Sequence, residues 1–138
     1  MYFDEDMLLD LRLNVLNKYV KKFVITEATY THSGKKKDLN FNFNNFEKFK
    51  EKIIYKIVDK KPPSLLELKK EDSTETRGKK LILNGYARDN FQREALVDGL
   101  KDALNDDLVI ISDLDEVPNL EATNFKNIQN KIIIFKQK

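Results

Sequence analysis

The chain has 138 residues, of which 41% are hydrophobic and 35% are charged, and its formal net charge is +2. This length supports one domain with its own core, and the composition is that of a soluble globular domain. A net charge so close to zero argues against a nucleic-acid partner. With no cysteine and one histidine, the chain has no disulfides, no cysteine nucleophile and no zinc site of the usual kind.

Residues 1–10 are acidic and lack the basic and apolar segments of a secretory signal. No apolar run in the sequence is long enough to cross a membrane. The absence of cysteine fits a reducing compartment. We therefore expect a cytoplasmic protein without a membrane span.

The first part of the chain predicts a helix followed by a strand. Glu5–Lys18 reads as an amphipathic helix, because its apolar residues recur at helical spacing. These residues are Leu9, Leu13, Leu16 and Val20. Phe23–Ile25 is a short apolar run typical of a buried strand, and Glu27 follows it. A carboxylate at the end of a strand is a candidate for a binding site or, alternatively, a solvated loop residue.

The middle of the chain predicts a second helix at Phe43–Lys52 and a second strand at Ile53–Val58. Asp59–Lys80 is rich in charge, carries two prolines and lacks an apolar stripe, so we expect a mobile surface loop. A third helix is predicted at Asn90–Asn105. Its expected core residues are Leu96, Val97, Leu100 and Leu104.

Three polar residues lie in or just before the first turn of this third predicted helix: Arg88, Asn90 and Arg93. Free N–H groups and the helix dipole favour anions at a helix N-terminus, so these side chains are candidates for contact with a phosphate. The alternative is that they are ordinary surface residues.

The stretch Asp107–Pro118 is the most informative part of the sequence. Leu108–Ile111 is a continuous apolar run, which predicts a strand buried on both faces. Ligands of open α/β sheets bind at the carboxyl ends of strands. Asp113 and Asp115, which follow this run, are therefore candidate ligands for one hard divalent cation. Alternatively, these carboxylates cap a helix or form an Asx turn.

The tail, Glu121–Lys138, predicts a weak helix and a last strand at Lys131–Phe135. Helices and strands thus alternate along the chain. This order predicts a single α/β domain over residues 1–138, with a mostly parallel sheet and helices on both faces. The four glycines are scattered, which excludes both the P-loop and the dinucleotide fingerprint.

Five stretches of the sequence, taken together and in this order, resemble one family. They are Leu11–Asn14, Phe23–Thr31, His32–Lys35, Asn90–Arg93 and Ile110–Asn119. This combination is similar to the family 17 glycosyltransferases, and the resemblance runs from Asp4 to Asn119.

The resemblance implies an A-type glycosyltransferase fold, which is a nucleotide-sugar-binding α/β sheet. It implies that Asp113 and Asp115 hold Mn²⁺ or Mg²⁺ against the donor diphosphate. Glu27 would lie in the same crevice near the nucleoside, and Arg93 would meet the diphosphate bidentately. The implied donor-binding residues are Glu27, Arg88, Asn90, Arg93 and Asp113. The implied reaction is an inverting transfer of a hexosyl group, N-acetylglucosaminyl, from a UDP-sugar (UDP-GlcNAc) to a glycan acceptor.

The catalytic base is not identified by this sequence. In inverting enzymes of this fold the base and the acceptor site usually come later than the Asp-x-Asp, and 23 residues follow Asp115. We therefore expect the donor-binding half of an incomplete fold: the product of a truncated gene, a fragment, or one of two pieces that a second copy of the chain or a second polypeptide completes.

Two other interpretations stay open. The first is a nucleotide-sugar-binding domain or partner subunit without turnover. The second is a phosphatase of the haloacid dehalogenase type, whose signature is also an apolar strand ending in Asp-x-Asp, with the first aspartate as nucleophile. That family needs a lysine and further acids after its motif, for which 23 residues leave little room.

Overall fold

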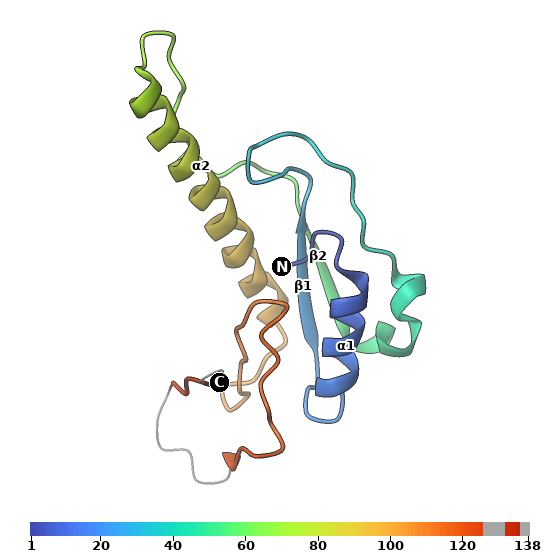
Figure 1. Ribbon diagram of the computed structural model, residues 1–138. Helices are drawn as coiled ribbons and strands as arrows, with labels where there is room; N and C mark the ends of the chain where they lie inside the picture. Colours follow the sequence, from blue (N-terminus) through green and yellow to red (C-terminus); the bar gives the residue numbers. More distant parts are fainter. Residues whose placement is uncertain (126–131, 136–138) are drawn as a thin grey trace.

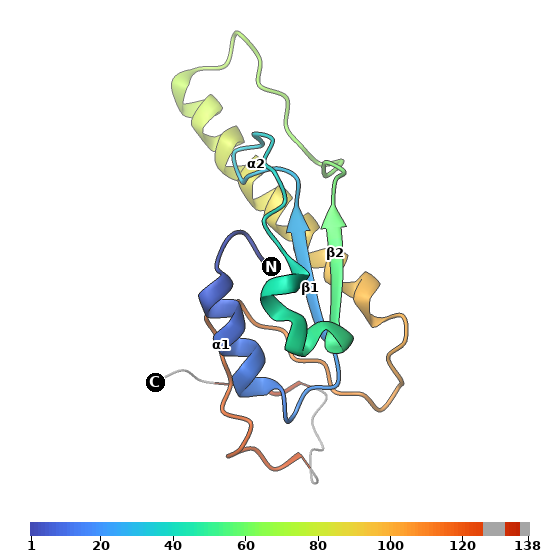
Figure 2. The same cartoon turned by 90° about the vertical axis from the view of Figure 1, so that its right-hand side faces the viewer.

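The computed structural model describes residues 1–125 and 132–135. Its elements follow in the order α1 (Asp6–Leu16), β1 (Phe23–Ala28), η1 (Phe43–Lys52), β2 (Ile53–Val58), α2 (Thr74–Glu94) and η2 (Ala95–Leu100), where η marks a 3₁₀ helix. Within the described residues, the sheet consists of β1 and β2. Helices α1 and η1 cover one face of the sheet, and α2 and η2 cover the other (Figure 1, Figure 2). The predicted α/β class, with parallel strands and helices on both faces, is therefore confirmed.

Helix α1 is the amphipathic helix that the sequence predicts, slightly shorter at both ends. Its buried residues are Leu9, Leu13 and Leu16. Spacings of four and three residues place them on one face of the helix. Asp6 in the first turn complements the positive end of the helix dipole.

The two strands pair in a parallel register that runs from Phe23 opposite Ile53 to Ala28 opposite Val58. Strand β2 has the predicted bounds, and β1 extends the predicted strand through Glu27 to Ala28. All residues of β1 except Val24 are buried. A strand covered on both faces explains why its first three residues, Phe23–Ile25, are apolar without alternation.

The main core lies between the sheet and the helices α1 and η1. Phe41 stacks on Tyr55 with ring centroids 4.5 Å apart, and on Phe46 at 5.4 Å. Leu120, far along the chain, is part of the same core. On the other face, Phe91 packs against a smaller cluster at the carboxyl ends of the strands. The last turn of α2 is thereby fixed beside the end of β1.

Helix α2 differs from the predicted third helix, because it begins at Thr74 and ends at Glu94. Ser73 caps it by accepting a hydrogen bond from the Thr76 amide at 3.2 Å. This cap lies in the stretch that reads as a loop. The helical part of the chain ends with η2 at Leu100. Val97 and Leu104, which were expected in the core, are 66% and 68% exposed.

The predicted mobile loop Asp59–Lys80 is shorter than expected, since its last residues belong to α2. The amide side chain of Asn84 ties it to the helix with two hydrogen bonds to the backbone of Leu66, at 2.7 and 2.9 Å. Lys80 also pairs with Asp72 at 2.7 Å. The mobility of the remaining loop stays a prediction.

The prediction of a central strand at Leu108–Ile111 is wrong. This segment has irregular backbone, and Leu108, Val109 and Ile111 are 63%, 51% and 80% exposed. A buried strand needs a free neighbouring edge. The free edge of β1 is taken near Thr26, whose carbonyl oxygen accepts from the Tyr2 amide at 2.9 Å and from the Gln92 side chain at 3.0 Å.

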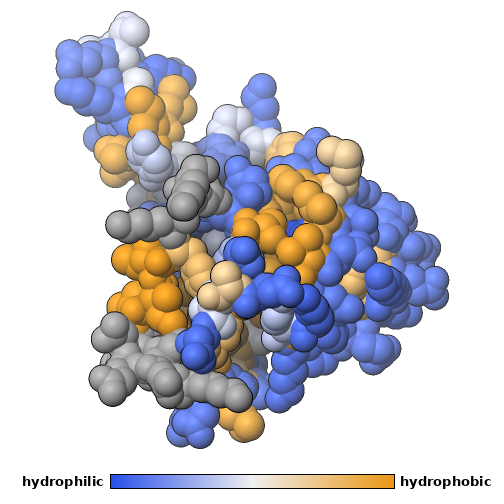
Figure 3. All heavy atoms as spheres, turned by 60° about the horizontal axis from the view of Figure 1, so that its bottom comes forward, coloured by the Kyte–Doolittle hydropathy of each residue, from blue (hydrophilic) through white to orange (hydrophobic). Residues whose placement is uncertain are grey.

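Apolar side chains are therefore exposed beyond η2. Figure 3, which brings the lower end of the molecule forward, shows hydrophobic residues at the surface of this face. Residues 132–135, part of the predicted last strand, are not in a strand, and Lys131 lies outside the described residues. No helix within the described residues is both long and apolar enough to cross a membrane.

Candidate functional site

A cavity of about 410 Å³ lies beside the carboxyl end of β1. Its walls come from the N-terminal segment, the loop after β1, the end of α2 and the segment around Asp113. Among the lining residues are Tyr30, His32, Lys37, Asp89, Arg93, Asp113 and Asp115. The Asp-x-Asp pair therefore does reach the end of a parallel strand, but that strand is β1.

The two aspartates sit in an irregular loop, residues 112–116, that one side chain of α1 holds in place. Nη1 of Arg12 donates to the carbonyl oxygens of Asp113 and Glu116, each at 2.8 Å, and to that of Leu114 at 3.4 Å. Its Nη2 donates to Ser112 Oγ at 2.6 Å. Arg12 thus fixes the backbone of the loop without engaging the carboxylates of Asp113 and Asp115.

The loop is also closed on itself. The Asp113 amide donates to Glu116 Oε2 at 3.1 Å, and the Glu116 amide donates to the Asp113 carbonyl oxygen at 3.1 Å. The second bond closes a β-turn, and the side-chain acceptor is Glu116, so this is not the helix cap or Asx turn of Asp113 and Asp115 considered as the alternative. Glu116 orders the loop, and Asp113 and Asp115 face the cavity.

Arg12 is a site residue that the sequence reasoning missed. Burial lowers the pKa of its guanidinium, and attraction by Glu116, Asp113 and Asp115 opposes this shift. A guanidinium remains charged in proteins, so it adds a fixed positive charge behind the acidic loop. Two features of the sequence could have drawn attention to Arg12. It lies between Leu9 and Leu13, two of the buried residues of α1, and it belongs to the first stretch that resembles the family.

Arg93 does lie at the cavity, at the end of α2 and not in its first turn. Its Nη1 lies 2.9 Å from Asp113 Oδ1, and its Nε lies 3.1 Å from Asp89 Oδ2. The hydrogen bond to Asp113 raises the pKa of Arg93 most, and the hydrogen bond to Asp89 raises it further. The prediction that Arg93 meets an anion at a helix N-terminus is therefore wrong, because Arg93 lies in the last turn of α2. The structure nevertheless brings Arg93 and Asp113 together.

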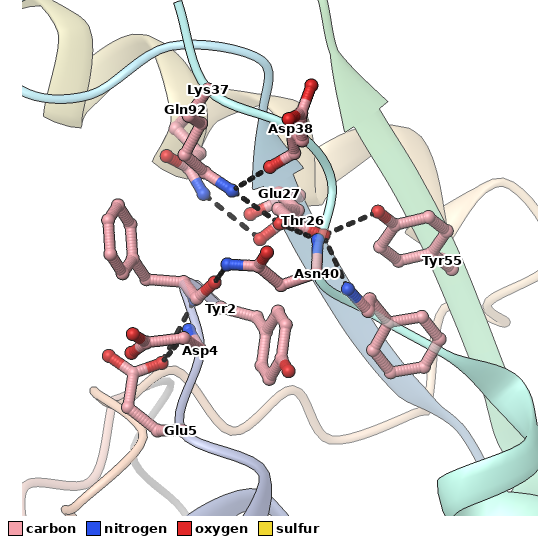
Figure 4. A network of polar contacts seen from close by, with 12 residues as sticks. Tyr2, Asp4, Glu5, Thr26, Glu27, Lys37, Asp38, Asn40, Tyr55 and Gln92 are labelled. Carbon is pink, nitrogen blue, oxygen red and sulfur yellow. Dashed lines mark hydrogen bonds and ion pairs between the residues drawn. The ribbon is translucent and has the colours of Figure 1, made fainter.

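Glu27 has a different environment from the one expected. It is fully buried, and its carboxylate accepts four hydrogen bonds (Figure 4). The donors are Lys37 Nζ at 2.5 Å, the Asn40 amide at 2.8 Å, the Phe41 amide at 3.1 Å and the Tyr55 hydroxyl at 2.7 Å. Burial alone would raise its pKa, but these donors outweigh burial and lower it.

The Glu27 carboxylate therefore holds the returning loop at residues 37–41 against β1. It does not line the cavity, whereas its partner Lys37 does. Lys37 Nζ also donates to the Asp38 carbonyl oxygen at 2.9 Å and lies over the Phe3 ring. The structure thus places Lys37 in the wall of the site.

The remaining predicted donor residues are Arg88 and Asn90. Arg88 donates to the His32 carbonyl oxygen at 2.8 Å and packs on Gly34, whose φ of +84° favours glycine. It supports the loop after β1 from outside the main cavity. Asn90 is exposed and does not line the cavity.

The donor set can hold a hard cation only with help from other oxygens. Within the described residues, no group of three or more histidine, cysteine, aspartate or glutamate side chains is placed to enclose a metal ion. Asp113 is 48% exposed at its side chain and Asp115 is exposed. Two accessible carboxylates fit a cation of the Mg²⁺ type, which keeps waters and takes further oxygens from phosphates.

Comparison with known proteins gives the family. The human and rat beta-1,4-mannosyl-glycoprotein 4-beta-N-acetylglucosaminyltransferases are each 29% identical to this chain over 126 residues, and the mouse protein is 28% identical. The match covers 86% of this chain but 21% of the human protein and 20% of the rat and mouse proteins. The chain thus spans about a fifth of the length of these relatives. No solved structure matches.

The family model described as glycosyltransferase family 17 matches residues 1–132, which is nearly the whole chain. This match includes the loop that holds Asp113 and Asp115, and it leaves the phosphatase interpretation without support. The chain belongs to glycosyltransferase family 17.

Proposed function

We propose that this chain binds the nucleotide-sugar donor of a metal-dependent, inverting glycosyltransferase. The cavity at the end of β1 takes the donor, and Asp113 and Asp115 hold Mn²⁺ or Mg²⁺ against its diphosphate. The observation that carries the proposal is that these two carboxylates and Arg93 line the same cavity of about 410 Å³.

The donor that we propose is UDP-N-acetylglucosamine. Three similar proteins are named as N-acetylglucosaminyltransferases. A cation at Asp113 and Asp115 supplies charge neutralisation for the departing nucleotide diphosphate. Arg12 holds the backbone of the loop in one geometry, so that the backbone carrying the two carboxylates need not reorganise when the cation and donor bind.

Other residues of the cavity contribute positive charge and shape. Lys37, held by the buried Glu27, adds an ammonium group to the wall. Tyr2, Phe3 and Tyr30 supply aromatic surface that suits a nucleobase or sugar ring. We propose an A-type glycosyltransferase fold for the complete enzyme.

A donor-binding part without turnover of its own is the second candidate function, and one observation favours it. The other carboxylates that line the cavity are already engaged: Asp89 pairs with Arg93, and Glu5 accepts from the amides of Phe3 and Asp4. Among the described residues, no cavity carboxylate is then left to act as a general base. A glycan acceptor and a base would come from another segment, a second copy or a second polypeptide.

Calorimetric titration of Mn²⁺ tests the proposed metal site. We expect Asp113→Asn and Asp115→Asn each to weaken binding strongly, because a neutral amide is a poorer ligand for a hard cation than a carboxylate. Asp106→Asn, an exposed aspartate outside the loop, is the matched control and should bind as the wild type does. Equal affinity of all four proteins would refute the assignment.

A further inference from the structure

Arg93 occupies the carboxylate that the proposed cation needs. Its Nη1 lies 2.9 Å from Asp113 Oδ1. The side chains of Arg93 and Asp113 are 43% and 48% exposed. The pair is therefore open to solvent and to ligands on the cavity side, and an ion pair this exposed is weak.

A guanidinium and a divalent cation cannot share this carboxylate without cost. Both are positive, and at the separation that one carboxylate allows they repel each other. Arg93 has a second anchor, because its Nε lies 3.1 Å from Asp89 Oδ2, one turn earlier on α2. If Nη1 leaves Asp113, Asp89 still holds the side chain at the wall of the cavity.

We propose that Arg93 is the resident counter-ion of Asp113, and that a binding cation displaces it toward a phosphate of the nucleotide. This inference rests on the proposed function. The released guanidinium presents a planar set of N–H donors, which match the oxygens of a phosphate group. Arg93 thereby keeps the acidic loop neutralised before the cation arrives and binds the diphosphate afterwards.

The exchange couples the two ligands. The cation gives up part of its affinity to displace Arg93, and the nucleotide gains a contact that exists only when the cation is bound. Coupling of this kind is reciprocal, so the nucleotide must raise the affinity for the cation by the same factor. A site in which Arg93 stayed on Asp113 would lack this link.

The first test measures Mn²⁺ affinity by calorimetry in the wild type and in Arg93→Gln. Exposed ion pairs are weak, so removal of the competitor should tighten Mn²⁺ binding by about two- to fivefold. Arg77→Gln, an exposed arginine on the same helix, removes the same charge and should leave the affinity unchanged. Arg93→Lys keeps the charge but loses the planar set of guanidinium donors, so its Mn²⁺ affinity should lie between those of the wild type and Arg93→Gln.

The second test measures UDP binding at saturating Mn²⁺. Arg93→Gln should bind UDP about tenfold more weakly than the wild type, since it lacks a charged donor to the phosphates. In the absence of the cation the two proteins should differ little. Equal UDP affinity at saturating Mn²⁺ would contradict the proposal.

The third test observes the side chain directly. In nitrogen NMR spectra, saturation with diamagnetic Mg²⁺ should shift the Arg93 guanidinium signals in the wild type but not in Asp113→Asn, with Arg77 as the internal reference. Unchanged Arg93 signals, or Mn²⁺ binding that is no tighter in Arg93→Gln, would overturn the exchange. Such a result, with affinity still lost in Asp113→Asn, overturns the exchange alone. Full Mn²⁺ affinity in Asp113→Asn would instead refute the proposed metal site.

Discussion

Replacing Arg12 with methionine tests whether α1 holds the acidic loop. Methionine keeps a long apolar side chain but removes the donors to the carbonyl oxygens of Asp113 and Glu116, at 2.8 Å each, and to Ser112 Oγ at 2.6 Å. The contact with the Leu114 carbonyl oxygen at 3.4 Å is beyond the usual range and counts little. At a net stabilisation of about 1 kcal/mol for each bond, the loop loses about 3 kcal/mol. This is on the order of a 100-fold change in the equilibrium between closed and open loop.

Amide hydrogen exchange is the suitable assay, because the loss falls on one loop. The reporters are the amides of Asp113 and Glu116, which bond to each other's residues across the loop. We expect their exchange to accelerate on the order of 100-fold in Arg12→Met, with β1 unaffected. Arg12→Lys should be intermediate, and Arg77→Met, at an exposed position, should change nothing. Equal exchange of both amides in the wild type and Arg12→Met would refute the role of Arg12.

Two further predictions concern stability, measured by urea unfolding. A Cβ at Gly99 would lie 2.3 and 2.6 Å from the methyl carbons of Val24, so Gly99→Ala should lower the free energy of unfolding by about 1–3 kcal/mol. Gly78→Ala, whose Cβ meets nothing within 4 Å, should instead raise the free energy of unfolding by up to about 1 kcal/mol. A change of the same sign in both variants would contradict the close packing of Gly99 on Val24. Glu27→Gln leaves the Lys37 ammonium, 10% exposed, without its counter-ion and should cost about 3 kcal/mol. Since folding lowers the pKa of Glu27, this stabilisation is complete above the unfolded pKa of about 4.3 and is lost as the pH falls through the folded pKa. A difference between wild type and Glu27→Gln that stayed constant on acidification would count against the buried pair.

The fold was predictable where local pattern and burial agree. The apolar spacing in α1 and the short apolar runs of β1 and β2 gave elements that the structure contains. The run at Leu108–Ile111 carries the same local signal and forms no strand. The difference is tertiary: a strand needs an edge to pair with, and at Thr26 the edge of β1 is bonded to Tyr2 and Gln92 instead.

The candidate site was predictable in part for the same reason. Residue type and family resemblance identified Asp113, Asp115 and Arg93, which meet at one cavity. Glu27 was identified as important, but its burial and its four donors could not be read from the sequence. Arg12 reaches a loop about 100 residues away, and no local pattern signals a contact of that range.

The most direct test of the proposed function is donor binding as a function of the cation. We would titrate UDP-N-acetylglucosamine into the wild-type chain by calorimetry, with Mn²⁺ and then with excess EDTA, and repeat the titration with Asp113→Asn. We predict binding to the wild type with Mn²⁺ and a loss of most of that affinity both in EDTA and in Asp113→Asn. Binding that is equally strong in all three titrations, or absent with Mn²⁺, would contradict a metal-dependent donor site at Asp113 and Asp115.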